Sequence, residues 1–484
     1  MSRDYCLVDE KFVMIIGYGK ASLLDIFRED SITDIAGSPI AKIALIKFFI
    51  AIAQAAVRIK DRTEWKAIGQ DGLAKKVCEY LENHRECFYL YGDKPFLQMP
   101  VLNEIQKIDD QTLSSDLLPD MAPENDTIFR ELQAGHELSN SDKAVFIIEL
   151  MNYALGGKRT SFIKPLSEGY ALRSKSSKPG PSIGNSLGYL HVFIKGKSIK
   201  ETVWLNYFTD NDILSMRPDF FLDVRPPWEK MPKGEDDEIA RKLKNSVYAW
   251  LCAVSRFVML TDKGMKYTEG LQYKSSVKDG YFEPFITINE KEKRVLYADP
   301  TKKVWRNLQA LLSAVYQEDQ VSPYACMQLV RFWQRTRSVC DRFSLWAGGL
   351  RVRTNSGDQS VKQSDDYVES EICLISKDLG KDFFMDLCNG MKRIDSYALL
   401  LRDRVNAYFR SMKSEDMSSR KAVASYWMAA DNVSADFINA CSEYDEEKIE
   451  MIMKSLFRTS LDLYDAACPH ESARQIFTWA KYRP

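Results

Sequence analysis

Residues 381–409 read KDFFMDLCNGMKRIDSYALLLRDRVNAYF. Apolar side chains recur here mainly at steps of three and four residues, which places them on one face of an α-helix. They are Leu387, Met391, Tyr397, Leu400, Leu401, Val405 and Tyr408. Further amphipathic helices are expected over residues 418–431 with an extension to 440, over 445–468 and over 471–482. Since short loops join these segments, we predict a C-terminal four-helix bundle over residues 366–484.

Residues 38–60 read SPIAKIALIKFFIAIAQAAVRIK and predict a second helix. Ser38 suits the N-cap and Pro39 the first helical position. Apolar residues surround the helix axis, so the helix should be buried in a protein core. Lys47 and Gln54 interrupt the apolar run, which argues against a membrane span.

The remaining N-terminal patterns are shorter and mix helix with strand. Helices are expected near residues 22–28, 72–83, 141–155 and 245–260, with another starting at 303–313. Strands are expected over 190–194 and 203–206, and a β-hairpin over 267–288 with its turn at Asp279-Gly280. The fold class is therefore α+β, with a large mixed α/β domain over residues 1–365 followed by the helical bundle.

The charge of the chain is balanced overall but uneven along its length. The 484 residues include 67 Lys or Arg and 68 Asp or Glu, which gives a net charge of −1. A free-standing nucleic-acid-binding protein is usually strongly basic. Residues 101–150 nevertheless hold 11 acids against three bases, and residues 156–200 hold nine bases against one acid. Such segregation suits a protein that touches a polyanion on one side and another partner elsewhere.

Motifs for catalysis or metal binding are missing from the sequence. There is no GxSxG, HExxH or GxxxxGK[ST] pattern, and no CxxC pair among the ten cysteines. We therefore expect no catalytic activity, no metal and no cofactor, and reduced cysteines in a cytoplasmic protein. The N-terminus lacks the apolar run of a secretory signal, and no membrane contact is expected.

Two loops combine features that suit nucleic-acid contacts. Gly156-Gly157-Lys158-Arg159 follows a predicted helix, and a backbone without Cβ atoms could approach a ligand closely beside two bases. A glycine that merely ends the helix would explain the same residues. The polar stretch 351–359 contains Asn355 and Gln359, which could read base edges or form a wedge at a hairpin tip. An interdomain linker is the alternative.

Two further segments carry weaker signals. Lys274 and Lys278 lie in the predicted 267–288 hairpin and could contact phosphates, although lysine also serves to keep an exposed strand edge soluble. The segment Asn125–Phe129 places two apolar residues in an acidic loop, where they could stack on a base or dock on a partner. Burial of these residues in their own domain is the alternative.

Taken in order, these segments resemble the CasA-type large subunit of the type I-E CRISPR surveillance complex, Cascade. The resemblance spans about residues 87–359, and the terminal bundle extends it. It rests on Phe88-Tyr89-Leu90, Pro95-Phe96-Leu97-Gln98, Asn125–Phe129, Gly156-Gly157, Pro227-Trp228, Ala298-Asp299-Pro300 with Trp305, and Gly348-Gly349-Leu350-Arg351.

The resemblance implies a non-catalytic subunit that recognises the protospacer-adjacent motif (PAM) in double-stranded target DNA. It would start unwinding so that the guide RNA can pair, and would help to recruit a helicase-nuclease. Expected partners are the 5′ handle of the guide RNA, the target DNA, the backbone, handle-binding and small subunits, and a helicase-nuclease or another effector nuclease. The expected location is the cytoplasm of a prokaryote.

Residue roles follow from the same resemblance. The PAM would be read by Gly156, Gly157, Lys158, Lys274, Lys278, Asn355, Ser356, Gly357 and Gln359, with Gln359 as the wedge. Non-specific DNA contacts would come from Arg159, Arg173, Lys175, Lys178, Arg351 and Arg353. Docking on the guide handle or backbone subunits would use Asn125, Asp126, Thr127, Ile128 and Phe129.

The sequence departs from many relatives of this family at one point. Residues 258–267 contain no cysteine where those relatives carry a CxxC…CxxC insertion, which supports the expectation of no zinc. A purely structural subunit of a related Cascade, without PAM reading, remains the alternative function. A nuclease would need clustered carboxylate or histidine ligands for metal ions, which the sequence does not show.

Overall fold

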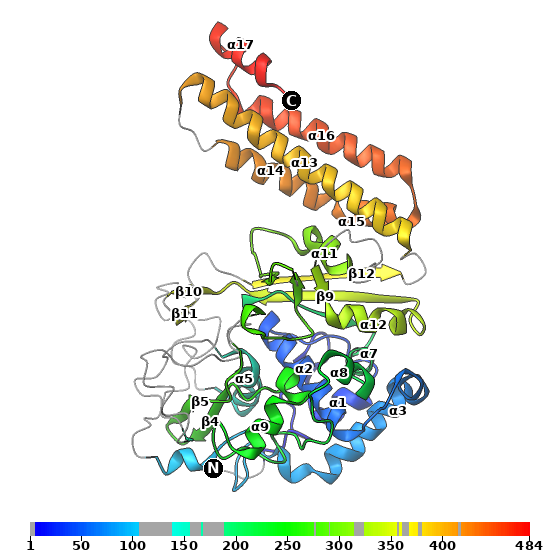
Figure 1. The fold of residues 1–484 in the computed structure, drawn as a ribbon, viewed down its shortest axis with the longest axis vertical. Helices are drawn as coiled ribbons and strands as arrows, with labels where there is room; N and C mark the ends of the chain where they lie inside the picture. Colours follow the sequence, from blue (N-terminus) through cyan, green and yellow to red (C-terminus); the bar gives the residue numbers. More distant parts are fainter. Residues whose placement is uncertain are drawn as a thin grey trace. The chain divides into compact units, whose positions relative to one another are not determined.

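The computed structural model describes residues 5–105, 138–154, 166–167, 188–274, 277–289, 291–313, 324–355, 358–360, 367–375, 380–414 and 418–484. The chain forms two compact units, and elements are labelled as in Figure 1. The first unit comprises Met1–Lys302, Pro323–Val339 and Phe343–Ile372. The second comprises Lys303–Ser322, Cys340–Arg342 and Cys373–Pro484. The domain boundary expected at residue 365 lies outside the described residues.

Helix α2 (Pro39–Ala56) forms the centre of the first unit (Figure 1). The Ser38 hydroxyl accepts a hydrogen bond from the backbone N–H of Ala41 at 3.2 Å, as expected of an N-cap. The helix is long and apolar enough to cross a membrane, but 83% of it is buried inside the protein, which is typical of a core helix. The helices packed against it are α3 (Arg62–Asn83), α5 (Asn140–Tyr153), α7 (Ile199–Leu205) and α10 (Tyr248–Leu251).

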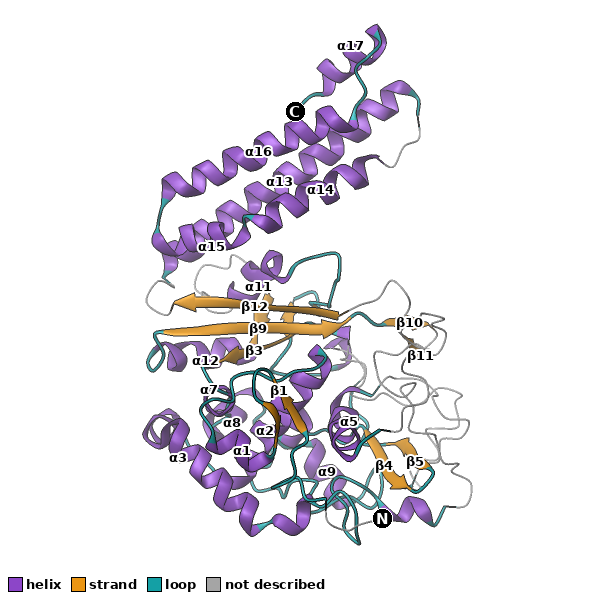
Figure 2. Cartoon of the chain, turned by 180° about the vertical axis from the view of Figure 1, so that it is seen from behind, coloured by secondary structure: helices purple, strands orange, loops and turns teal. Residues whose placement is uncertain are grey.

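A three-stranded antiparallel sheet lies beside these helices. Its strand order is β12 (Tyr367–Ile375), β9 (Arg342–Leu350), β3 (His191–Lys195), as Figure 2 shows. In the register of β3 and β9, His191 lies opposite Gly348 and Lys195 opposite Ser344. Helix α12 (Met327–Arg337) contacts β3. The long strand β9 therefore connects the core of the first unit with the segment that begins at Arg351.

The smaller strands form hairpins and short sheets. They are β1 (Val13–Ile15) with β2 (Gly19–Ala21), β4 (Arg256–Thr261) with β5 (Gly264–Glu269), β10 (Arg353–Asn355) with β11 (Asp358–Ser360), and β6 (Thr287–Asn289) between β7 (Arg294–Val295) and β8 (Tyr324–Cys326). Other short helices are α1 (Leu23–Arg28), α8 (Asp210–Met216), α9 (Glu238–Lys244), α11 (Leu308–Ser313), and the 3₁₀ helices η1 (Arg85–Phe88), η2 (Pro100–Asn103), η5 (Val277–Asp279) and η6 (Val304–Asn307).

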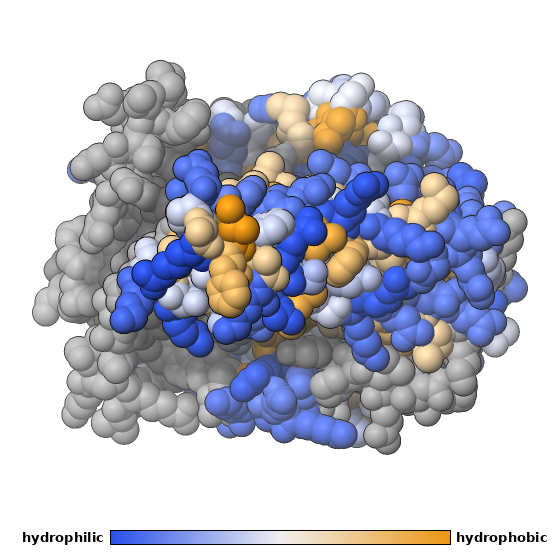
Figure 3. All heavy atoms as spheres, turned by 90° about the horizontal axis from the view of Figure 1, so that it is seen from above, coloured by the Kyte–Doolittle hydropathy of each residue, from blue (hydrophilic) through white to orange (hydrophobic). Residues whose placement is uncertain are grey.

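The second unit contains the predicted helical bundle. Helix α13 (Lys381–Met412) contacts α14 (Ser418–Asn432), α15 (Ser434–Glu443), α16 (Glu446–Ala467) and α17 (Ala473–Tyr482). Helices α14 and α15 meet at Val433 and occupy the place of one interrupted helix. The stripe predicted from residues 387–408 forms the interior, where Leu387, Leu401 and Val405 are fully buried. On the face drawn in Figure 3, apolar atoms form small patches between polar ones.

Three predictions for the middle of the chain are wrong. Residues 203–206, predicted as a strand, lie largely in α7, because Ser198 caps a helix by accepting a hydrogen bond from the N–H of Glu201 at 3.2 Å. The helix predicted over 245–260 is limited to α10; Val254 then takes a φ of +53° and the chain enters β4. The hairpin predicted over 267–288 is replaced by the β4–β5 hairpin, and Asp279 belongs to η5.

Candidate nucleic-acid interface

The structure describes only some of the residues predicted to contact nucleic acid. Those outside the described residues are Asn125–Phe129, Gly156, Gly157, Lys158, Arg159, Arg173, Lys175, Lys178, Ser356 and Gly357. Of Arg353, Asn355 and Gln359 the backbone alone is described. Lys274, Lys278 and Arg351 are described with their side chains, so the geometry of the site is built from these three and their surroundings.

Both lysines lie on a segment that is anchored to a small apolar cluster. The OH group of Tyr273 donates a hydrogen bond to the carbonyl oxygen of Ala253 at 2.8 Å, directly before the exposed Lys274. Val277 is buried directly before the exposed Lys278. The cluster consists of Tyr189, Ala253, Val277, Tyr281, Ile286, Ile288 and Val295, with Tyr273 and Phe282 packed against it. The backbone next to each lysine is therefore anchored, at Tyr273 and at Val277, while both lysine side chains are exposed.

Strand β9 approaches the same cluster at Gly349, and the preceding Gly348 lies against the ring of Trp346 in the same strand. A Cβ atom on Gly349 would lie 2.5 Å from the carbonyl oxygen of Tyr189, closer than real Cβ atoms come. A Cβ atom on Gly348 would lie 2.5 Å from the ring of Trp346. Glycine at both positions therefore lets β9 pass against residue 189 and the indole, which is a packing role for the Gly348-Gly349 pair.

Beyond the glycines, Arg351 is partly paired with an acid. Its guanidinium Nη1 lies 3.8 Å from Oδ1 of Asp299, and 38% of its side chain is exposed. Burial alone would raise the pKa of Asp299, but hydrogen bonds from Thr301 and the charge of Arg351 hold it below its usual value. Arg351 thus keeps a carboxylate beside it, which reduces its attraction for phosphate.

The segment predicted as a polar wedge forms a tight hairpin. Strands β10 and β11 pair antiparallel, with Arg353 opposite Ser360, Thr354 opposite Gln359 and Asn355 opposite Asp358. Residues 356 and 357, between the two strands, lie outside the described residues. The segment is therefore a hairpin and not an extended interdomain linker.

The sequence analysis missed a basic turn next to Lys278. Lys291, Lys293 and Arg294 are all exposed around the β6–β7 turn, and β7 contacts η5, which carries Lys278. A nearby aromatic residue, Tyr297, is 60% exposed, and its ring centroid lies 5.2 Å from that of the buried Tyr189. The signal for this surface was the three bases among residues 291–294, which lie shortly before the quoted motif Ala298-Asp299-Pro300. Glu292 lies between these bases, and its carboxylate is 3.2 Å from the Arg294 guanidinium.

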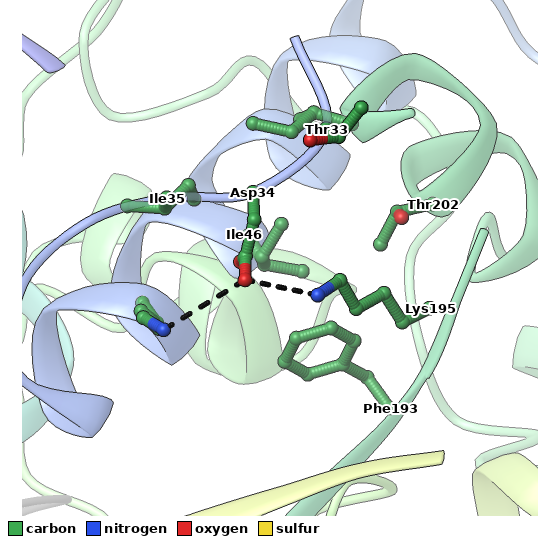
Figure 4. A pocket seen from close by; sticks show the side chains of 9 residues that line it. Thr33, Asp34, Ile35, Ile46, Phe193, Lys195 and Thr202 are labelled. Atoms are coloured by element: carbon green, nitrogen blue, oxygen red, sulfur yellow. Dashed lines mark hydrogen bonds and ion pairs between the residues drawn. The ribbon is translucent and has the colours of Figure 1, made fainter. Parts of the chain in front are cut away.

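A pocket at the edge of the β12–β9–β3 sheet holds charges that cancel one another. Figure 4 shows the Asp34 side chain beside Lys195, and Lys42 is a second basic residue next to Asp34. The Asp34 carboxylate lies 2.9 Å from the Lys195 amine and 4.0 Å from that of Lys42. Lys42 also pairs with Glu369 at 2.7 Å, and Lys195 with Glu371 at 2.6 Å. Burial would lower the pKa of Lys195, but hydrogen bonds to Glu371 and Asp34 raise it. These pairs tie β12, the strand after the hairpin, to α2 and β3.

Among the described residues, no group of three or more His, Cys, Asp or Glu side chains could hold a metal ion. The expectation of no metal and no cofactor stays a prediction.

Comparison with known proteins identifies the family of this chain. The family model described as CRISPR-associated protein Cse1 matches residues 7–463, which is nearly the whole chain. The chain belongs to the Cse1 family. The assignment to the CasA-type family made from the sequence motifs is thereby confirmed. No match was found among curated protein sequences.

Solved structures share the Cse1 fold over the full length. Cse1 of Thermobifida fusca has a TM-score of 0.72 at 19% identity, covering 99% of this chain and 97% of that chain. CasA (Cse1) of Thermus thermophilus has a TM-score of 0.69 at 17% identity, covering 99% and 98%. A chain of a structure named CRISPR RNA-guided surveillance complex has a TM-score of 0.71 at 14% identity, covering 99% and 98%. At these identities the likeness concerns the fold.

Proposed function

We propose that this Cse1-family chain is the non-catalytic large subunit of a type I-E Cascade, and that it recognises the PAM in double-stranded target DNA. In this role it begins unwinding of the duplex so that the guide RNA can pair, and it helps to recruit a helicase-nuclease or another effector nuclease. One observation supports this proposal above the others. The segment with Lys274 and Lys278, called the lysine segment below, shares an apolar cluster with Tyr189. Strand β9, which leads to the β10–β11 hairpin, packs against the same residue.

A shared anchor matters because reading a short motif requires fixed geometry. Contacts to base edges and phosphates work only when the groups that make them are held within a fraction of an ångström. Tyr189 belongs to the apolar cluster that contains Val277, and its carbonyl oxygen abuts Gly349. Lys274 and Lys278 on one side and the β10–β11 hairpin on the other therefore extend from one rigid base.

Each element would make a different kind of contact with the DNA, as its chemistry suggests. Lys274 would enter the minor groove beside the PAM, and the glycine loop at residues 156–157 would approach the duplex with its backbone. The hairpin tip would wedge between base pairs, which costs a few kcal/mol of unstacking per step. Minor-groove and phosphate contacts offset this cost.

The basic turn extends the DNA-binding surface that we propose. Lys291, Lys293 and Arg294 add positive charge next to Lys278, and Arg353 adds a base in β10. Phosphate contacts of this kind supply affinity without sequence preference. Since the net charge of the chain is −1, such attraction is local to one surface, and assembly with the guide-loaded subunits supplies the rest.

The other partners are proposed from the family alone. Residues 125–129 would dock on the 5′ handle of the guide RNA or on the backbone subunits, next to the handle-binding and small subunits. Lys158, Arg159, Arg173, Lys175 and Lys178 would face the duplex. The complex would act in the cytoplasm of a prokaryote.

The test compares a lysine variant with a matched control in the reconstituted complex. K274A/K278A removes two exposed lysines of the site, and K66A/K75A removes two exposed lysines of α3. We expect K274A/K278A to bind a PAM-bearing duplex about tenfold or more weakly, given the usual cost of losing a specific contact. The control should bind as the unmodified chain does. Equal binding by both variants would favour a purely structural subunit without PAM reading.

A further inference from the structure

The core of the first unit contains a fully buried ion pair that the proposed DNA contacts do not use. Nζ of Lys47 on α2 lies 2.6 Å from Oε1 of Glu283, and neither side chain has any exposed surface. Three more polar groups surround the pair. The Lys47 amine also donates to the OH of Tyr153 at 3.2 Å. The OH of Tyr281 donates to Oε2 of Glu283 at 2.6 Å, and Nε2 of His191 lies 3.5 Å from Oε1.

Stability alone does not account for such a pair. Removing two charges from water is costly, and apolar residues of similar volume often serve a core equally well. Burial by itself would raise the pKa of Glu283, but the charge of Lys47, together with His191, holds it well below its usual range. The carboxylate is therefore ionised, and its two oxygen atoms hold groups from different elements in fixed directions.

The ion pair and its three polar neighbours form a network. Its members lie close in sequence or in the sheet to the segments that we propose to contact DNA. Tyr153 is the last residue of α5, three positions before Gly156. Tyr281 and Glu283 follow η5, which carries Lys278. His191 lies in β3 opposite Gly348 of β9, the strand that leads to the β10–β11 hairpin. The buried ion pair thus joins the end of α5, the segment after η5 and strand β3, which lead along the chain to the proposed glycine loop, the two lysines and the wedge.

We propose that the network of Lys47, Glu283, Tyr153, Tyr281 and His191 is a positioning device that sets the mutual placement of the three DNA-reading elements. It determines discrimination between flanking sequences more than overall affinity for DNA. This inference rests on the proposed function. Lys47 and Glu283 are positioning residues, because fully buried side chains cannot touch the duplex.

Directional bonds give the network a role that the neighbouring apolar cluster cannot fill. Apolar contacts tolerate small shifts of one surface over another, whereas hydrogen bonds to an ionised oxygen weaken when distance or angle changes. Hydrogen bonds inside a core, where no water competes for the donors and acceptors, favour one arrangement of the elements that they join. Loss of the network should therefore loosen the placement of the reading elements before it unfolds the chain.

The variant K47M/E283Q removes both charges while keeping similar volumes and an acceptor for Tyr281. A matched control is R335M/D212N, because Arg335 and Asp212 form another largely buried pair, 3.0 Å apart, on α12 and α8. Each variant is reconstituted into the guide-loaded complex, and binding to duplexes with PAM and non-PAM flanks is measured. We expect K47M/E283Q to lose discrimination by about tenfold while its affinity for non-PAM duplex changes less than about threefold. The control should keep its discrimination.

A milder variant covers the case in which K47M/E283Q does not fold or assemble. Y281F removes one hydrogen bond to Glu283 and leaves the ion pair intact, and we expect a smaller loss of discrimination in the same direction. Full discrimination by the network variants, while K274A/K278A loses it, would overturn this inference and leave the proposed function standing. If the complex with the unmodified chain shows no preference between PAM and non-PAM flanks, the proposed function is wrong, and this inference is wrong with it.

Discussion

The carbonyl oxygen of Tyr189 lies so close to Gly349 that a Cβ atom at residue 349 would stand 2.5 Å from it. Tyr189 also belongs to the apolar cluster that fixes the lysine segment. This contact joins two parts of the chain that are far apart in sequence. One is the cluster that carries the lysine segment, the other is β9 with the β10–β11 hairpin, and we propose that residues of both contact DNA. The placement of the proposed reading surface therefore depends on a close approach that only glycine permits.

The variant G349A tests this contact. The added methyl group must displace backbone, so we expect the free energy of unfolding to fall by about 1–3 kcal/mol. The control is G188A, where a Cβ atom would meet Val352 at 3.5 Å, an ordinary contact distance. Urea unfolding measures both. Equal stability of G349A and the unmodified chain would show that β9 does not pack against Tyr189 as described.

The hairpin variants Q359A and N355A test the wedge assignment. If the β10–β11 tip separates base pairs, Q359A should slow opening of the first pairs while binding to the PAM duplex persists, because anchoring and opening use different elements. Fluorescence of 2-aminopurine placed next to the PAM reports the opening. Opening at an unchanged rate in both variants would remove the wedge role from this hairpin.

The basic turn should act through charge alone. K291A/K293A should weaken duplex binding, and the slope of log affinity against log salt should become shallower by up to about two, since each phosphate contact contributes about 0.9. Flank preference should be unchanged. K66A/K75A serves as the control for general charge loss. We expect the same behaviour from K175E/K178E, and unchanged slopes in both sets would show that these surfaces do not face DNA.

The buried carboxylate should make stability depend on acid. The pKa of Glu283 in the folded chain lies well below the ordinary value, because Lys47 and His191 favour the ionised form despite burial. Below about pH 4.5 a glutamate in the unfolded chain binds a proton, whereas Glu283 in the folded chain stays ionised. The contribution of Glu283 to the free energy of unfolding therefore declines as the pH falls. Urea unfolding from pH 6 to pH 3 should therefore show a steeper loss for the unmodified chain than for K47M/E283Q. Parallel curves would contradict an ionised Glu283.

A separate prediction concerns the second unit alone. The indole N–H of Trp305 donates to Oδ1 of Asp431 at 2.8 Å, and the Arg306 guanidinium lies 3.8 Å from the centroid of the Trp427 ring. D431A removes the acceptor for a partly buried donor, which should cost about 1–3 kcal/mol. Hydrogen exchange should rise in residues 304–313. The control D462A changes an exposed acid of α16, and equal exchange in both variants would refute this anchoring role.

The sequence predicted those helices whose apolar pattern can be read within one continuous segment, without knowledge of what packs against them. The stripe over residues 387–408 and the all-round apolar helix after Ser38 each indicate both helix and burial, and both predictions are confirmed. Residues 245–288 could not be predicted in this way. There the chain turns at Val254, and Gly270 packs so closely that a Cβ atom on it would lie 2.2 Å from the Val254 carbonyl oxygen. Such a contact is tertiary, and the Asp279-Gly280 turn signal pointed to the wrong hairpin.

The candidate site shows the same limit. The family resemblance suggested Lys274, Lys278 and the wedge segment, and these assignments stay predictions, whereas the predicted hairpin that should carry the lysines is wrong. The Lys47–Glu283 pair could not be predicted from the sequence. Lys47 stands out as a charge inside the apolar helix, but its partner is 236 positions away and resembles an ordinary charged residue. The basic turn at 291–294 was visible as a charge run, but only the contact between β7 and η5 places it beside Lys278.

The most direct test of the proposed role uses the guide-loaded complex, reconstituted with and without this chain. Both complexes are incubated with duplexes that share one fixed target and carry randomised flanking bases, and the bound duplexes are sequenced. Enrichment of a short flank motif only when the chain is present is the predicted result. Equal recovery of all flanks, with and without the chain, would contradict PAM recognition by this subunit.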